Sequence, residues 1–204
     1  NLTFKSACSP SDPNGNSIPE EVIAVTKRDV TISNSNTYFD TVSIAPGASV
    51  TVAVGASINA NSATILNSTS STFSSLIVKG NINGFVSYNR YTALIGSAAG
   101  GTNDLISAPV VGEIFGAFAT ANPNLAASGN FRAFAPYNTS AGAYQNYDTA
   151  NNANTTISSG IGYRAATVDG STLKFTGTVR TVPVNVSISD ASAGNAWNLI
   201  GNPY

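Results

Sequence analysis

Short apolar and β-branched segments alternate with small polar residues through the first half of the chain. Between residues 28 and 95 the segments read DVTI, DTVSI, SVTVAV, SATIL, SLIV and GFVSYNRY, and they recur at a spacing of roughly 10 to 13 residues. This spacing suits a sandwich, a meander or the coils of a solenoid. The segments are short and lack Asn-Gly turns flanked by long alternating runs. The pattern therefore favours a short right-handed β-helix-like stalk over residues 28–95.

In a β-helix each strand stacks on the strand one coil earlier. On this interpretation four apolar residues take equivalent inward positions: Val30, Val50, Ile65 and Ile77. An open end of the stack exposes unpaired backbone and needs a cap. We expect three aromatic side chains to supply that cap: Phe85, Tyr88 and Tyr91.

The second half of the chain has a different pattern, which begins after a Gly/Ala/Ser-rich stretch at 93–104. The phrase GEIFGAFATANPN predicts a short helix with Ile114, Phe115 and Phe118 on one face, and several β-prone segments follow it. Most aromatic residues lie in this half. We therefore predict an all-β chain with at most one or two short helices, in which residues 1–27 form an irregular leader and first strand and residues 96–204 form a β-sandwich.

The sequence ends on AWNLIGNPY, which contains the only tryptophan. Trp197 and Leu199 fall on the same side of a strand, so we expect the indole to pack into the sandwich core. Gly201, Asn202 and Pro203 form a turn signal. We expect this turn to lead into further C-terminal domains.

Charged residues are scarce, and this scarcity narrows the range of functions. They make up 9% of the chain, against about 25% in an average soluble domain. The formal net charge is −1, so no basic stripe is available to neutralise phosphates, and we predict no nucleic-acid partner. No apolar run reaches the roughly 20 residues that a membrane-spanning helix needs, and we predict no membrane insertion.

The chain contains no histidine and one cysteine, which excludes His-based triads, His-ligated metal sites and Cys-rich zinc clusters. A carboxylate pair remains as a hydrolytic device, but the spacing of the acids brings no two of them together. We therefore predict that the protein is not an enzyme and has no cofactor, apart from one candidate calcium site. Asp12, Asn14 and Asn16 supply alternating oxygen ligands in DPNGNSIPEE, although the EF-hand pattern fails there and an Asx turn explains the same residues.

Three tyrosines are candidate ligand-binding residues. Tyr137, Tyr144 and Tyr147 lie in PYNTSAGAYQNY, a polar segment whose amides could hydrogen-bond sugar hydroxyls while the rings stack on sugar faces. The same rings alternate with small apolar residues, which favours core packing.

Three phrases, in this order, carry a resemblance: SLIVKGNINGFVSYNRYTAL, NDLISAPVVGEIFGAF and GYRAATVDGSTLKFTGTV running to AWNLIGNPY. Together they resemble a module of large secreted surface proteins of Bacteroidetes, the cargo of the type IX secretion system, over residues 28–204. The resemblance implies a cell-surface or secreted location and passage through that secretion machinery. Leu105 and Ile106 stand where such modules often carry tryptophan, and the sorting domain of these proteins is not part of the sequence.

Two tripeptides, DTV and DTA, resemble the O-glycosylation sites of exported Bacteroidetes proteins. The resemblance implies that Thr41 and Thr149 carry sugars.

Three functional hypotheses follow, in order of preference. The first is a non-catalytic extracellular module of an adhesin-like or filament-forming surface protein, which contacts other surface subunits or neighbouring domains of its own chain. The second is a carbohydrate-binding accessory module of a secreted glycan-degrading protein. The third, a hydrolase with a carboxylate pair, has the least support in the sequence.

Overall fold

The computed structural model describes residues 2–5, 22–35, 37–96, 103–190 and 196–203. Strands account for 49% of the chain and helix for 4%, with a β-solenoid of about 3 turns followed by additional sheets, so the predicted fold class is confirmed. The chain divides into two compact units, Asn1–Arg90 and Tyr91–Tyr204. We describe each unit by itself.

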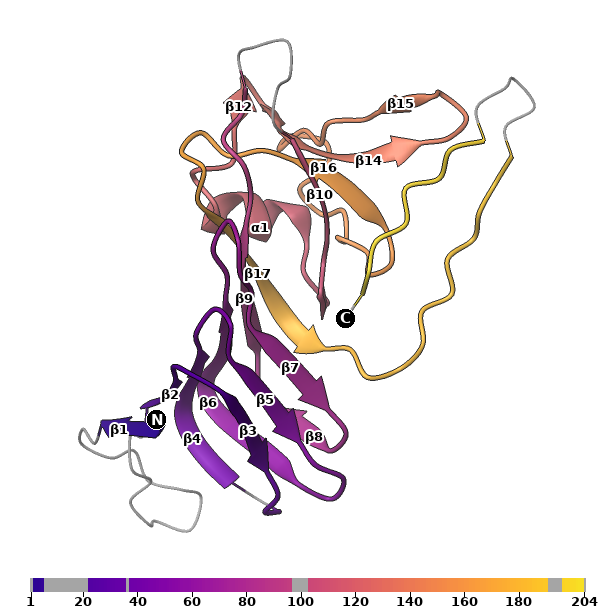
Figure 1. Ribbon diagram of the computed structural model, residues 1–204. Helices are drawn as coiled ribbons and strands as arrows, with labels where there is room; N and C mark the ends of the chain where they lie inside the picture. The colour runs from indigo at the N-terminus through magenta and orange to yellow at the C-terminus, as the bar shows by residue number, and fades with distance from the viewer. Residues whose placement is uncertain (1, 6–21, 36, 97–102, 191–195, 204) are drawn as a thin grey trace. The chain divides into compact units, whose positions relative to one another are not determined.

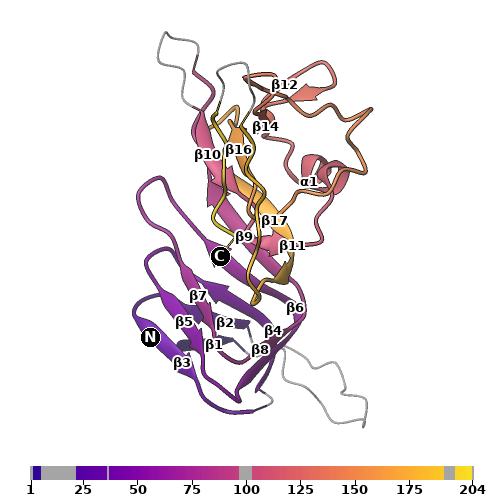
Figure 2. The same cartoon turned by 90° about the vertical axis from the view of Figure 1, so that its right-hand side faces the viewer.

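The first unit is the solenoid, which is built from short strands (Figure 1). Its strands are β1 (Leu2–Lys5), β2 (Val22–Val25), β3 (Asp29–Ile32), β4 (Thr37–Ile44), β5 (Ser49–Val52), β6 (Ser57–Asn67), β7 (Ser75–Val78), β8 (Asn81–Asn83) and β9 (Val86–Tyr91). One wall is a parallel stack of β2, β4 and β6, which continues into β8 and β9, and β1 pairs antiparallel with β2. The other wall is the parallel sheet β3-β5-β7 (Figure 2). The coils thus add strands to both walls in turn, and the last coil adds two short strands, β8 and β9, to the first wall.

The stacked coils keep their register, so apolar residues form columns inside the solenoid. Val50 aligns with Val30 in the coil before and with Leu76 in the coil after. The expectation that Ile77 points inward is therefore wrong by one residue, and its side chain is 47% exposed. Because side chains alternate between the faces of a strand, a shift of one position moves a residue from the inside to the outside. The expectation for Ile65 is also wrong. Ile65 lies in the first wall, where it aligns with Ser43 one coil earlier, and it is half-buried between the buried residues Thr64 and Leu66.

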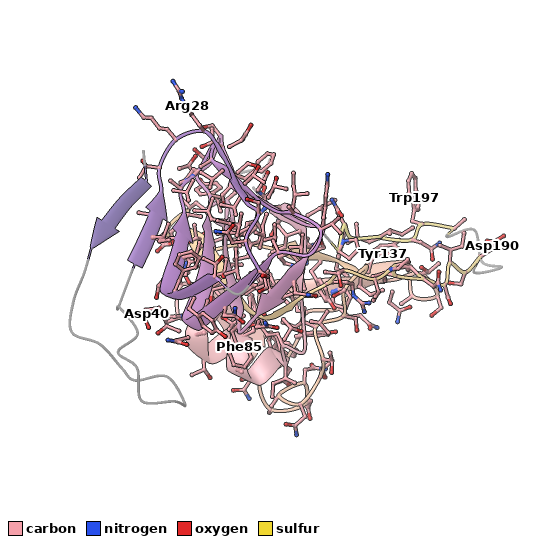
Figure 3. The ribbon with its side chains drawn as sticks, turned by 90° about the horizontal axis from the view of Figure 1, so that it is seen from below. Arg28, Asp40, Phe85, Tyr137, Asp190 and Trp197 are labelled. Atoms are coloured by element: carbon pink, nitrogen blue, oxygen red, sulfur yellow. The ribbon has the colours of Figure 1, made fainter. Side chains whose placement is uncertain are left out.

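One of the three aromatic residues predicted to cap the stack lies in solvent. Phe85 is 60% exposed, so it does not close the solenoid (Figure 3). Tyr88 and Tyr91 are half-buried.

Asparagine amides stack along the first wall. The Asn83 amide nitrogen donates to the Asn59 side-chain oxygen at 2.7 Å, and the Asn89 amide nitrogen donates to the Asn67 side-chain oxygen at 2.9 Å. The Asn59 and Asn67 amides in turn donate to backbone carbonyls one coil earlier. Amide ladders of this kind satisfy polar groups along a stack without charge, which accounts for part of the Asn-rich, charge-poor composition.

The second unit consists of small antiparallel sheets and one described helix. Its elements are β10 (Asp104–Ser107), β11 (Val110–Val111), α1 (Phe115–Ala121), β12 (Ala127–Ser128), β13 (Phe131–Arg132), β14 (Phe134–Asn138), β15 (Ala143–Tyr144), β16 (Gly162–Ala165) and β17 (Thr172–Val179). A four-stranded sheet has the order β10-β16-β14-β15, while β11 pairs with β17 and β12 with β13. The predicted helix is confirmed, with Phe115 and Phe118 buried. The prediction that Ile114 shares their face is wrong, because Ile114 is the N-cap before the helix and is 40% exposed.

An aromatic cluster fills the core of this unit. Phe134 is central, because its ring lies 4.5 Å from Tyr163 and 4.8 Å from Phe118. Phe175 of β17 also packs on Phe118 at 4.8 Å and lies 6.4 Å from Phe134. These rings join the four-stranded sheet, α1 and β17 into one core, with both Phe134 and Phe175 fully buried.

Candidate functional site

The four-stranded sheet of the second unit turns one face to the aromatic core and the other face away from it. Tyr163 of β16 points to the core, so its neighbour Arg164 points to the outer face. In the register of the sheet Arg164 lies between Leu105 of β10 and Ala135 of β14. Two residues beyond Ala135, Tyr137 lies directly opposite Tyr144 of β15. The antiparallel register thus gathers residues from four strands on one face.

The side chains on this outer face contact one another. The Arg164 guanidinium carbon lies 4.4 Å from the centroid of the Tyr144 ring, and an Arg164 terminal nitrogen donates to the Asn146 side-chain oxygen at 3.4 Å. The Tyr137 and Tyr144 rings meet edge to face, with centroids 5.2 Å apart and planes at 73°. Leu105 at the rim is 57% exposed. We call the set of Leu105, Tyr137, Tyr144, Asn146 and Arg164 the tyrosine–arginine face.

Two of the three predicted tyrosines, Tyr137 and Tyr144, therefore lie together on one surface. Tyr147 lies elsewhere, because its ring packs on the aromatic core, 5.0 Å from Phe115. Burial raises the pKa of Tyr147, as it does the pKa of Tyr163. The structure adds Arg164 to this surface and identifies Asn146 as the amide of the segment that bonds it. The sequence signal for Arg164 was weak, since it is 20 residues from Tyr144 in the chain (164 − 144) and only the sheet register joins them.

Glu113 is a buried carboxyl that the sequence analysis did not single out. It is 6% exposed, and its Oε1 accepts the Thr176 backbone N–H at 3.0 Å, while its Oε2 has no hydrogen-bond partner among the described residues. Burial raises the pKa of Glu113 to about 8, and the Thr176 N–H and the charge of Lys174 lower it only in part. A charge flanked by apolar residues in VVGEIFGAF was its only sequence signal.

The remaining predicted site residues do not form a cluster. Asp12, Asn14 and Asn16 lie outside the described residues. Thr41 and Thr149 are half-buried; the Thr41 hydroxyl donates to Asp40 Oδ2 at 3.0 Å and the Thr149 hydroxyl to the Asn130 carbonyl at 3.2 Å. Within the described ranges, no group of three or more His, Cys, Asp or Glu residues could hold a metal ion.

The expectation that the Trp197 indole packs into the core is wrong, because its side chain lies outside the core. It is 77% exposed and points away from the ribbon (Figure 3). The backbone around it is held by its neighbours: the Thr139 hydroxyl donates to the Trp197 carbonyl at 2.7 Å, and the Asn198 side-chain amide bonds both backbone groups of Ser189. This segment has almost no strand pairing of its own, so the alternation of a strand could not bring the indole inward.

No protein-family model, curated protein or solved structure matches the chain. The resemblance to type IX secretion cargo therefore stays a prediction. In the part of the chain that the structure describes, no helix has the length and apolar character needed to cross a membrane.

Proposed function

We propose that the chain is a non-catalytic extracellular module of an adhesin-like bacterial surface protein, and that its tyrosine–arginine face binds carbohydrate. The observation that carries the proposal is the contact of Tyr137, Tyr144 and Arg164 on an outer sheet surface. Each of these side chains is half-buried, so it is held in place yet still reaches solvent.

The chemistry of the face suits a sugar ring. Aromatic rings present an apolar surface with a polar tip, and the C–H groups of a sugar ring can pack on that surface. Arg164 and Asn146 add hydrogen-bonding groups beside the rings, as ligand sites do to fix orientation. A rigid sheet also supports the side chains more precisely than a loop would.

Composition supports a non-catalytic role in an extracellular setting. The chain has no histidine, and a polar uncharged surface is consistent with exported β-proteins. In this proposal, the solenoid acts as a spacer that carries the binding unit, and neighbouring domains and the type IX secretion machinery are its other partners. Glycans attached at Thr41 and Thr149 remain part of the same proposal.

A glycan array probed with the intact protein tests the proposal. We expect binding to a subset of glycans and a loss of at least tenfold in affinity for Tyr144→Ala. Tyr38→Ala is the matched control, since Tyr38 is a 55% exposed tyrosine in the solenoid, and it should bind as the wild type does. Absence of binding to any glycan, or equal binding by Tyr144→Ala, would remove the proposal.

A second candidate is a structural or filament-forming module, and one feature of the solenoid favours it. β3 is an edge strand of the sheet β3-β5-β7, and edge strands pair readily with other chains. Sedimentation at rising concentration tests this candidate. Growth of assemblies that Thr31→Lys on β3 abolishes would support it, and a constant monomer mass would exclude it.

A further inference from the structure

The guanidinium of Arg164 lies over an aromatic ring and beside an amide oxygen. Its contacts are the ring of Tyr144 and the side-chain oxygen of Asn146, and Leu105 and Ala135 lie opposite it in the sheet. Across the described ranges no carboxylate forms an ion pair with it. A guanidinium has several N–H donors and no acceptor, so the single bond to Asn146 leaves donors available.

The position of the guanidinium on a ring also favours a planar anion. Stacking on Tyr144 limits the rotation of the guanidinium, so less conformational entropy is lost when it forms two parallel hydrogen bonds. Carboxylates accept such bidentate bonds with two oxygens and an opposite charge, whereas a neutral hydroxyl offers a single oxygen and no negative charge.

We infer that the tyrosine–arginine face selects acidic glycans, in which a uronic acid carboxylate binds Arg164 while the sugar ring packs against Tyr144 or Tyr137. This inference rests on the proposed carbohydrate-binding function and narrows its ligand class. The charge of Arg164 provides the selection for acidic glycans. The tyrosine rings contact acidic and neutral sugars alike.

Titration with matched oligosaccharides tests the inference. Oligogalacturonate and neutral galacto-oligosaccharides of the same length are the probes, and calorimetry with the full chain gives the affinities. We expect the acidic probe to bind at least tenfold more tightly than the neutral one at low salt, with the preference falling as salt rises. Free galacturonate and free acetate are added as competitors of the acidic probe. Competition by galacturonate and not by acetate would show that the sugar ring and its carboxylate are recognised together. Equal competition by acetate would overturn the inference.

Two variants of Arg164 separate the role of charge from that of folding. Arg164→Gln should reduce the acidic-to-neutral affinity ratio to near one, and Arg164→Lys should keep part of the preference because it keeps the charge. Arg132→Gln is the matched control, because Arg132 bonds only backbone carbonyls of its own turn and should leave the ratio unchanged. Equal affinity of the wild type for both probes would overturn this inference and leave carbohydrate binding intact. Failure of both probes, together with a blank glycan array, would overturn both proposals.

Discussion

The guanidinium carbon of Arg164 lies 4.4 Å from the centre of the Tyr144 ring, and both side chains stand on the outer face of a four-stranded sheet. The contact depends on the register of three strands, since Arg164 faces Ala135 and Tyr144 faces Tyr137 two residues further along β14. A cation–π contact at a partly exposed site contributes about 0.5–1 kcal/mol. It is thus a modest stabilising contact that also positions a cation on the surface.

Glu113 predicts a pH dependence of stability. Its pKa is raised from the ordinary value of 4.5 to about 8, so the folded state binds the proton more tightly than the unfolded state. The stabilisation that this proton gives the folded state is complete below about pH 4.5 and is lost as the pH rises towards 8. We expect Glu113→Gln to raise Tm by several degrees at pH 9 and to change it little at pH 4. Thermal denaturation at both pH values is the measurement. Asp190→Asn, an exposed acid, is the control, and an equal effect of both variants at pH 9 would contradict this explanation.

A turn of the solenoid contains a strained residue. Arg28 has a φ of 81° and is the non-glycine residue with positive φ among those described, whereas Gly47, in the corresponding turn one coil later, has the same φ. An L-residue in this conformation costs roughly 1–2 kcal/mol. We expect Arg28→Gly to stabilise the protein by about 0.5–1 kcal/mol after the higher chain entropy of glycine is counted.

The matched variant at the glycine is Gly47→Ala. No atom lies within 4 Å of the position its Cβ would take, so any cost arises from the backbone. It should destabilise by about 1 kcal/mol. Chemical denaturation measures both variants, and a destabilising Arg28→Gly would show that the arginine side chain matters more than its φ.

Substitution at the centre of the aromatic core should lower the free energy of unfolding much more than substitution at its edge. Phe134 is fully buried against Tyr163 and Phe118, so Phe134→Ala should cost about 3–5 kcal/mol. Phe131, three residues earlier, is 53% exposed, and Phe131→Ala should cost less than about 1 kcal/mol. Urea denaturation followed by near-ultraviolet circular dichroism reports the loss of the aromatic packing. Similar costs for the two variants would mean that the cluster is not the core of this unit.

We expect Asn198 and Trp197 to contribute differently to the order of the segment that contains them. Asn198 joins its amide to both backbone groups of Ser189, at 3.0 and 2.8 Å, whereas the neighbouring indole is 77% exposed. Asn198→Ala should speed amide hydrogen exchange at Ser189, and Trp197→Ala should leave it unchanged. Hydrogen exchange followed by mass spectrometry measures both. Faster exchange in Trp197→Ala alone would contradict this account, because it would show that the indole and not the Asn198 amide orders the segment.

The sequence indicated the repeating coils, the helix with Phe115 and Phe118, and the all-β class, because each depends on local periodicity. It did not indicate the exact stacking of Leu76 on Val50, since a shift of one residue leaves the composition of a segment unchanged. It also failed for Trp197: alternation implies burial only where a strand has a sheet to join.

The candidate face was predicted in part. A polar segment with three tyrosines drew attention to Tyr137 and Tyr144, but the chain does not reveal which rings turn inward. Tyr147 follows Tyr144 by three residues and packs on Phe115, after β15 has ended. Only the pairing of β14 with β16 places Arg164 on this face, where it contacts Asn146.

The most direct test of the central proposal is to locate the bound sugar by NMR. Titration of the isotopically labelled protein with oligogalacturonate should shift the resonances of Tyr137, Tyr144, Asn146 and Arg164 in a saturable manner, while those of the solenoid tyrosine Tyr38 stay in place. The same titration of Tyr144→Ala should give shifts that no longer saturate. Saturable shifts confined to other surfaces, or none at any concentration, would contradict the proposal that this face binds carbohydrate.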